Sequence, residues 1–290
     1  MYNQIDSNKR KSLALMILFV LVIVALVFAW AQYSEAGYYM LIPATLFATG
    51  MSLISFFAGD KIALAASGAK KIKKEDNPYL WRIVENLSIT AGLSMPKIHI
   101  IDDQAMNAFA TGRDPEHASI AVTTGLLANL ENEELEGVIA HELSHVKNYD
   151  IRLMMVVIVC VGIITLLADW MMRSFIFRGR GSNDNNKGGP LIIIGIVLAI
   201  LSPLFAKLIQ MAVSRKREFL ADASASLLTR YPEGLARALE KISAQNIPLK
   251  KANKATAHLY ISSPFKGQSI SKLFSTHPPV EERIKALRTM

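Results

Sequence analysis

EELEGVIAHELSHVKNYD, residues 133–150, carries the pattern H-E-x-x-H at its centre. On an α-helix, side chains four positions apart share a face about one turn apart, so His141 and His145 can direct imidazole nitrogens at one metal ion. Glu142 lies beside them and can act as a general base toward an attacking water. The pattern therefore predicts a helical metal site with a carboxylate at its side.

The residues around this pattern favour a helix. Asn132 is a good N-cap, and Glu133 and Glu134 place negative charge at the positive end of the helix dipole. Apolar residues recur at helical spacing and give the helix one apolar side: Leu135, Val138, Ile139 and Val146. An ordinary amphipathic helix can also carry two histidines four positions apart. Evidence from the rest of the sequence is therefore needed to distinguish a metal site from an ordinary helix.

The composition indicates a membrane protein. Of the 290 residues, 51% are hydrophobic, and they concentrate in four long runs. The net charge of +8 raises the question of nucleic acid, but the basic residues border the apolar runs and the sequence has no RNA- or DNA-binding signature. We therefore expect a lipid bilayer, and no nucleic acid, as a partner.

Cys160 is the one cysteine, so an internal disulfide is excluded.

Two apolar runs near the start of the chain predict two transmembrane helices. Residues 12–34 and 37–59 carry no charge, and each run is long enough for a span of about 20 residues. A signal peptide cleaved near Trp30 is the alternative, but the first run is too long for a usual one. Basic residues precede the first run and follow the second, which predicts that both flanks lie in the cytoplasm.

Two further runs, residues 153–168 and 188–206, follow the H-E-x-x-H helix. Two full crossings would place the loop between them outside the cell, yet this loop is basic, with Arg173, Arg178, Arg180 and Lys187. Either two spans or a shallow, re-entrant hairpin is therefore consistent with the sequence. In both cases the chain leaves and returns on the same side.

Between the second and third runs, the sequence predicts an α+β unit. Residues 78–91 predict a helix that ends at Gly92, residues 97–101 predict a strand, and residues 107–111 and 118–123 predict two strands joined by a turn. The predicted fold is a mostly α integral membrane protein with four apolar helices, the third and fourth as a hairpin, and a cytoplasmic α+β zincin-like catalytic domain with a small sheet. Its segments are a tail with two transmembrane helices (1–59), the first part of the catalytic domain (60–152), the membrane hairpin (153–206) and the second part of the catalytic domain (207–290).

Two histidines leave a catalytic zinc one protein ligand short. The metzincin pattern, with a third histidine six positions after the second, is excluded because Asn148 and Ile151 hold the places of its glycine and histidine. The acidic candidates downstream are Asp150, Asp169, Glu218, Asp222, Glu233 and Glu240. Geometry favours Glu218. The third run begins roughly 12 Å after His145 along a helix, and the fourth ends roughly 18 Å before Glu218, so both groups lie at comparable heights above the membrane.

Asp222 follows Glu218 by one helical turn and can accept a hydrogen bond from the second nitrogen of a ligand histidine. The alternative is that residues 215–218, Arg-Lys-Arg-Glu, form a solvated charge cluster beyond a membrane helix. The pairing of the two helices favours Glu218 as the ligand.

Three motifs in this order resemble the HtpX family of membrane zinc endopeptidases: HELSH at 141–145, EFLAD at 218–222 and STHPPVEERI at 275–284, around an apolar hairpin. The chain is more distantly similar to the CAAX prenyl proteases of the endoplasmic reticulum. The resemblance covers nearly the whole chain, including the two leading spans and the segment NAFATG at 107–112. It implies one Zn²⁺ per chain, held by His141, His145 and Glu218, with Glu142 catalytic.

Two further elements have two interpretations each. His277 is held extended by the prolines that follow it, so it can donate a hydrogen bond to the oxyanion, or it simply opens the turn before the last helix, where Arg283 pairs with an acid. With Asp222, Arg283 would then lie around the metal ligands. The second element is predicted as either an exposed edge strand that aligns an extended substrate or an ordinary hairpin strand, and it consists of Asn107, Ala108, Phe109, Ala110 and Thr111.

The resemblance further implies a stress-linked protease that clears misfolded or damaged membrane proteins, or other unfolded polypeptides, from the bacterial inner membrane. Such a protein would be multi-pass, with its catalytic domain in the cytoplasm. Two alternatives stay open at this point. One is a CAAX-type processing peptidase that acts on prenylated peptides, and the other is a metal-stabilised scaffold or chaperone without turnover. The sequence predicts no particular oligomeric state.

Overall fold

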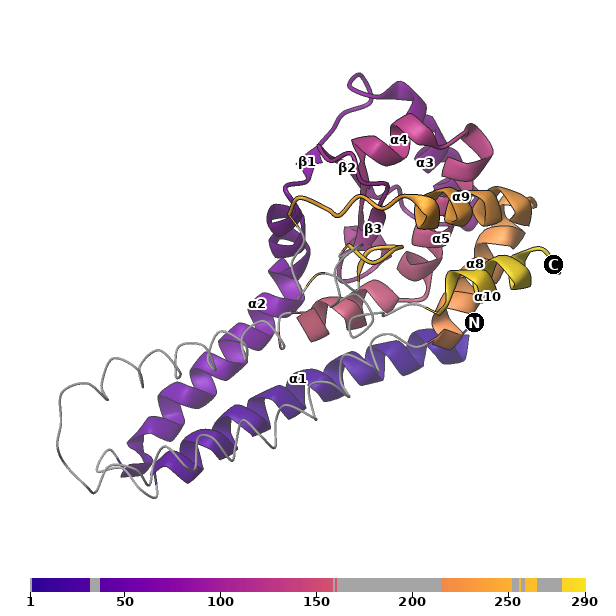
Figure 1. Cartoon of the computed structure of the whole chain (residues 1–290). Coiled ribbons are helices and arrows are strands. Elements are labelled where there is room, and N and C mark those ends of the chain that lie inside the picture. Colours follow the sequence, from indigo (N-terminus) through magenta and orange to yellow (C-terminus); the bar gives the residue numbers. More distant parts are fainter. Residues whose placement is uncertain are drawn as a thin grey trace.

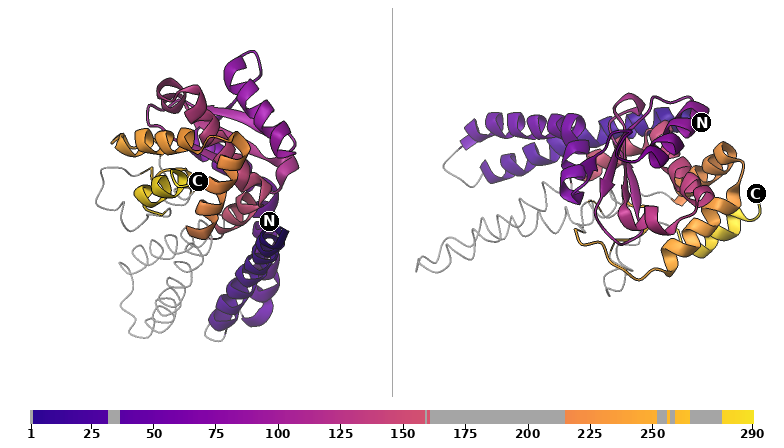
Figure 2. Two further views of the ribbon diagram at one scale, coloured as in Figure 1. Left: turned by 90° about the vertical axis from the view of Figure 1, so that its right-hand side faces the viewer. Right: turned by 90° about the horizontal axis from the view of Figure 1, so that it is seen from above.

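The computed structural model describes residues 2–31, 37–158, 160, 215–251, 256, 259–264 and 278–290. Two long helices, α1 (Tyr2–Ala31) and α2 (Leu41–Ser67), run side by side away from the unit that carries the sheet (Figure 1, Figure 2). A short 3-10 helix, η1 (Gly37–Met40), leads into α2. The apolar side chains of Leu15, Phe19 and Ile23 in α1 share a buried cluster with Ala48 of α2, which holds the two helices together.

Among the described residues, one helix is long and apolar enough to cross a membrane, and it covers Tyr38–Ser67. It contains most of the second predicted run, 37–59, and continues beyond it. The first predicted run, 12–34, lies mainly in α1, which begins earlier and includes the basic residues of the tail. The third and fourth runs lie outside the described residues except for 153–158 and 160, so four crossings stay a prediction.

The sheet has four strands in the order β1-β2-β4-β3: β1 (Lys70–Lys71), β2 (Lys97–Ile101), β3 (Ala108–Thr111) and β4 (Ser119–Thr123). β2 and β4 run parallel, and the two outer pairs are antiparallel. The three strands predicted from the sequence are confirmed to within one residue at each end. β1 is not predicted, because two lysines after an apolar helix have the pattern of a basic flank and not of a strand.

The helix that carries H-E-x-x-H, α5 (Asn132–Lys147), lies at the centre of this unit. It packs against α3 (Pro78–Ala91), α8 (Arg215–Thr229) and α9 (Pro232–Ala244), while α4 (Thr124–Asn129) precedes it and α10 (Val280–Leu287) contacts α8 and α9. The prediction of a single apolar side is too narrow, because residues 134–135 and 137–146 are all buried. The polar residues of the pattern are therefore enclosed by other elements.

The predicted N-cap of α5 is wrong by one residue. Glu131 is the N-cap, and its backbone N–H donates to the Glu134 carboxylate at 2.8 Å. Asn132 is the first helical residue instead, and its side chain donates to Glu136 at 2.9 Å. The physical reason is a capping box, in which a carboxylate three residues into the helix reaches back to the N-cap backbone.

α5 and α9 approach each other closely through two glycines. A Cβ on Gly137 would lie 2.8 Å from the backbone nitrogen of Leu235, and a Cβ on Gly234 would lie 2.5 Å from the carbonyl oxygen of Glu133. Backbone atoms cannot move aside as the end of a flexible side chain can. The absence of side chains at both positions therefore lets α9 lie directly on α5.

Gly137→Ala should destabilise the protein, because the added methyl group has to push α9 away at a cost of about 1–3 kcal/mol. Thermal unfolding of the detergent-solubilised protein measures the effect. Gly50→Ala is the matched control, since Gly50 lies in α2 and no atom is found within 4 Å of the place its Cβ would take. An equal loss of stability in both variants would contradict the close contact.

Candidate active site

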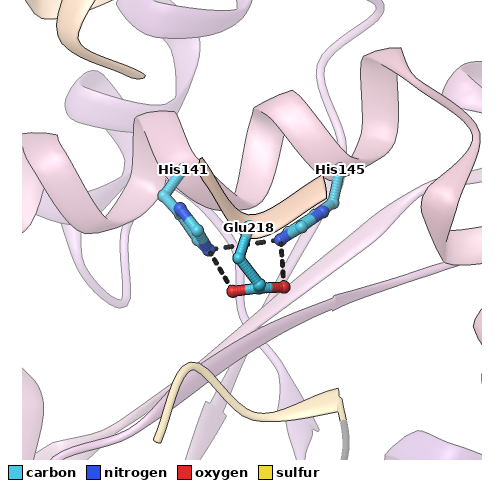
Figure 3. Close-up of side chains that lie close together, drawn as sticks. All are labelled: His141, His145 and Glu218. Carbon is cyan, nitrogen blue, oxygen red and sulfur yellow. Dashed lines mark hydrogen bonds and ion pairs between the residues drawn. The ribbon is translucent and has the colours of Figure 1, made fainter. Parts of the chain in front are cut away.

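His141 and His145 of α5 and Glu218 of α8 converge on one point (Figure 3). The Nε2 atoms of the two histidines lie 3.2 Å apart. One carboxylate oxygen of Glu218 lies 3.7 Å from His141 Nε2, and the other lies 3.6 Å from His145 Nε2. All three side chains are buried. The structure thus brings together the three residues that the sequence predicts as metal ligands.

The separations of these atoms suit a tetrahedral zinc ion. Two ligand atoms about 2.0–2.1 Å from such an ion lie roughly 3.3 Å from each other, close to the distances between these three groups. One ligand atom from each residue lies within 4.8 Å of those of the other two. Two imidazole nitrogens and a carboxylate oxygen are also the ligand set of a common class of catalytic zinc site. The residues present therefore fit the metal.

His141 is oriented by a carboxylate from the same helix as Glu218. Its Nδ1 lies 2.9 Å from Asp222, and Arg283 of α10 donates to both oxygens of Asp222, at 2.8 and 2.7 Å. Arg283 also lies 3.7 Å from Glu218. Burial alone would raise the pKa of Asp222, but the charge and the hydrogen bonds of Arg283 hold it below its usual value. Asp222 therefore stays ionised and accepts a hydrogen bond from Nδ1–H of His141, which leaves the Nε2 lone pair available to a metal ion.

His145 is oriented by Asp150, a contact that the sequence does not predict. Its Nδ1 lies 3.1 Å from Asp150 Oδ2. Burial alone would lower the pKa of His145, but the bond to Asp150 and the charge of Glu218 raise this pKa to about 9. The surroundings of His145 thus favour a positive charge. Asp150 follows His145 by five residues, which is not a helical spacing. The two side chains meet because the chain turns at Tyr149, which has a left-handed φ of 58°.

Glu142 lies on α5 between the two histidines in sequence and is buried. Burial raises its pKa, an effect that the neighbouring His141 and His145 partly offset. The backbone of Ala110 in β3 also lowers the pKa of this carboxylate, which places the strand beside Glu142. A raised pKa brings a carboxylate closer to the operating pH, which suits a general base.

β3 forms one edge of the sheet. It begins at Ala108, one residue later than the predicted stretch 107–111, and ends at the same residue. Its four residues are buried, which differs from the exposed edge strand that is one of the two interpretations of the sequence. The backbone oxygen of Ala108 accepts a hydrogen bond from Ile261 at 3.0 Å, and the Asn107 side chain donates to the backbone oxygen of Ser262 at 2.9 Å. The start of this edge is therefore covered, while its Ala110 end borders Glu142.

His277 lies outside the described residues, so its role as an oxyanion donor stays a prediction. The last helix, α10, begins at Val280, directly after the two prolines that the sequence predicts as its turn. Arg283 lies in this helix, fully buried beside Asp222 and Glu218.

Comparison with known proteins decides the family. Residues 74–290 match the model of peptidase family M48. The chain belongs to this family. A "Protease HtpX homolog" of Dictyoglomus turgidum is 47% identical to this M48 chain, and the match covers 100% of the chain and 94% of the relative. Another of Tropheryma whipplei (strain Twist) is 44% identical, with 100% of the chain and 98% of the relative covered.

A solved structure shows the same fold. The crystal structure of S. mikatae Ste24p matches this M48 chain with a TM-score of 0.52 and 19% sequence identity, over 99% of this chain and 67% of that one. Membership in family M48 makes the chain a metallopeptidase, and its apolar helix and its HtpX relatives make it a membrane protein. The predicted resemblance to the HtpX family is confirmed.

Asp222→Asn should lower the metal affinity of this M48 chain about 10- to 100-fold, the usual effect of removing the partner of a ligand histidine. Competition with a fluorescent zinc chelator measures the affinity. Glu233→Gln is the matched control, because Glu233 also accepts two hydrogen bonds from an arginine, Arg288, but does so at the surface, at 3.1 and 2.9 Å. Wild-type affinity in Asp222→Asn would show that Asp222 does not orient His141.

Proposed function

We propose that the chain is a zinc-dependent endopeptidase of the bacterial inner membrane that cleaves misfolded or damaged membrane proteins on the cytoplasmic side. The observation that carries this proposal is the convergence of His141, His145 and Glu218 at distances that suit zinc, with Glu142 next to the pair on α5. The HtpX relatives, which match this chain along its whole length, support a membrane-bound protease.

A zinc ion in this site would polarise the scissile carbonyl and lower the pKa of the attacking water. Glu142 takes the proton from that water and passes it to the leaving nitrogen, a role that its raised pKa favours. Asp222 and Asp150 accept hydrogen bonds from the Nδ1–H groups of His141 and His145. The Nε2 atom of each ring is therefore available to bind zinc. His277 would donate a hydrogen bond to the developing oxyanion.

The Ala110 end of β3 suits an extended substrate. β3 is an edge strand, the backbone of Ala110 acts on the pKa of Glu142, and the Ala108 end is already bonded to Ile261. A substrate strand that pairs with the second half of residues 107–111 would therefore have its backbone beside the general base. Main-chain pairing reads few side chains, which gives the broad sequence tolerance that a quality-control protease requires.

The charges around the membrane helices support a catalytic unit on the cytoplasmic side. Lys9 and Arg10 lie near the start of α1, and Lys70 and Lys71 follow the end of α2. α1 and α2 pack together and both of these ends lie at the unit that carries the sheet (Figure 1). Since basic flanks stay in the cytoplasm, the unit that carries the active site lies there as well.

Glu142→Gln should keep about one zinc per chain and reduce proteolysis about 10²- to 10⁴-fold, because an amide cannot take the proton. Elemental analysis gives the zinc content, and cleavage of an unprenylated membrane protein in detergent gives the activity. Undiminished cleavage would contradict the role of Glu142. A scaffold without turnover predicts no cleavage by the wild-type protein, and a peptidase restricted to prenylated peptides predicts that this substrate stays intact.

Glu218→Ala should strip the metal and abolish cleavage, because only two protein ligands are left. Glu240→Ala is the control for loss of a carboxylate at the surface, where Glu240 pairs with Arg288 at 2.9 Å, and it should keep both zinc and activity. Chelation of the wild-type protein should stop cleavage, and added zinc should restore it. Full zinc occupancy in Glu218→Ala would point to a different third ligand.

A further inference from the structure

One asparagine of α1 contacts the carboxylate that orients His145. Asn8 of α1 is 0% exposed, although the next residues, Lys9 and Arg10, are exposed. Its Nδ2 donates to Asp150 Oδ1 at 2.8 Å and to the backbone oxygen of Asn148 at 2.9 Å. These acceptors lie just after the end of α5. A residue near the N-terminus therefore contacts the end of the helix that carries H-E-x-x-H.

Asp150 divides its two oxygens between Asn8 and His145. Oδ2 lies 3.1 Å from His145 Nδ1, while Oδ1 accepts the hydrogen bond from Asn8. Arg217 of α8 lies 3.5 Å from the same Oδ1. With Oδ1 held in place, the carboxylate cannot rotate about its Cβ–Cγ bond, so Oδ2 stays directed at the histidine ring. The amide of Asn8 thus acts on the orientation of a proposed zinc ligand through one carboxylate.

The turn that carries Asp150 also depends on α1. Tyr149 has a φ of 58°, a left-handed conformation that costs a bulky residue about 1–2 kcal/mol. Asn8 bonds on both sides of this residue, and the Nζ of Lys9 lies 4.4 Å from the centroid of the Tyr149 ring. Two consecutive residues of α1 therefore stabilise the turn that folds Asp150 back onto His145.

Apolar packing keeps α1 in this position. Leu15 and Phe19 of α1 share a buried cluster with Leu153 and Val156, which follow the turn within the helical residues 150–158. α1 lies outside residues 74–290, which match the family model, so family membership alone gives it no part in the site.

We propose that Asn8 is a positioning residue for His145. By fixing Asp150, it holds the ring in the orientation that binds zinc, so the docking of the first membrane helix sets the strength of the metal site. This inference rests on the proposed zinc site. It goes beyond that site by assigning α1, which the sequence predicts as a membrane anchor, an effect on metal affinity that acts through Asp150.

Asn8→Ala in the full-length, detergent-solubilised protein tests the proposal. Zinc affinity, measured by competition with a fluorescent chelator, should fall about three- to tenfold, less than for a direct partner of a ligand because Asn8 acts through Asp150. The visible absorption spectrum of the Co²⁺-loaded protein should shift as well, since one ligand ring changes its orientation. Asn8→Leu, which has a similar branched shape and no donor, should give the same result without leaving a cavity.

A double-mutant cycle separates the path through Asp150 from a general loss of stability. In the Asp150→Ala background, Asn8→Ala should cause no further loss of zinc affinity, because the residue that it acts through is gone. Its effect on thermal unfolding should persist there, since the bond to the Asn148 backbone is lost in both backgrounds. An equal loss of zinc affinity in both backgrounds would overturn the proposal.

Ser12→Ala is the matched control on the same helix. Ser12 is also buried, but its hydroxyl donates to the backbone oxygen of Asn8 at 2.8 Å, within α1. The zinc affinity of the Ser12→Ala variant should equal that of the wild-type protein. A loss as large as that in Asn8→Ala would overturn the proposal, and so would unchanged affinity in Asn8→Ala. A wild-type protein that binds no zinc would instead contradict the proposed function.

Discussion

Charges that are buried together have to neutralise one another, and the active site depends on how they do so. Around the two histidines, the described residues include four buried carboxylates and two buried guanidinium groups: Glu142, Asp150, Glu218, Asp222, Arg217 and Arg283. With all six ionised, negative charge exceeds positive charge by two, which is the charge of one divalent cation. The same excess of negative charge raises the pKa of His145 to about 9, because the neighbouring carboxylates favour a positive charge at the position where a metal ion would bind.

Two hydrogen-bonded chains of the same form hold the histidines. One runs from His141 to Asp222 and on to Arg283 of α10, and the other runs from His145 to Asp150 and on to Asn8 of α1. In each chain a carboxylate fixes a ring, and a donor from a distant helix fixes the carboxylate. α10 and α1 are the last and the first helix of the described chain, and both ends of the chain lie near α8 (Figure 1). Residues of the first and the last described helix therefore contact the carboxylates that orient the two ligand histidines.

The sequence predicts the parts of this arrangement that depend on regular spacing. The i, i+4 histidines, Asp222 one turn after Glu218, and the strands of the sheet all follow from helical or extended periodicity. The convergence of His141 and Glu218 is predicted from the positions of the two residues on either side of two apolar runs in the sequence. Asp150 and Asn8 could not be found in this way. The first depends on a left-handed residue that is not glycine, and the second depends on how α1 docks on a turn 140 residues later.

The two chains differ in strength, and this difference follows from where they end. A guanidinium that donates twice to a carboxylate forms two bonds in which both partners are charged, whereas the neutral amide of Asn8 donates once to a carboxylate and once to a backbone oxygen, and its own Oδ1 has no partner among the described residues. An arginine at position 8 would be buried as Asn8 is, and burying its charge would carry a large desolvation cost. A neutral amide avoids this cost and binds less tightly. His145 is therefore held through a neutral donor of α1 and through Arg217 of α8 at 3.5 Å, whereas His141 is held through a guanidinium of α10 that donates twice to the same carboxylate.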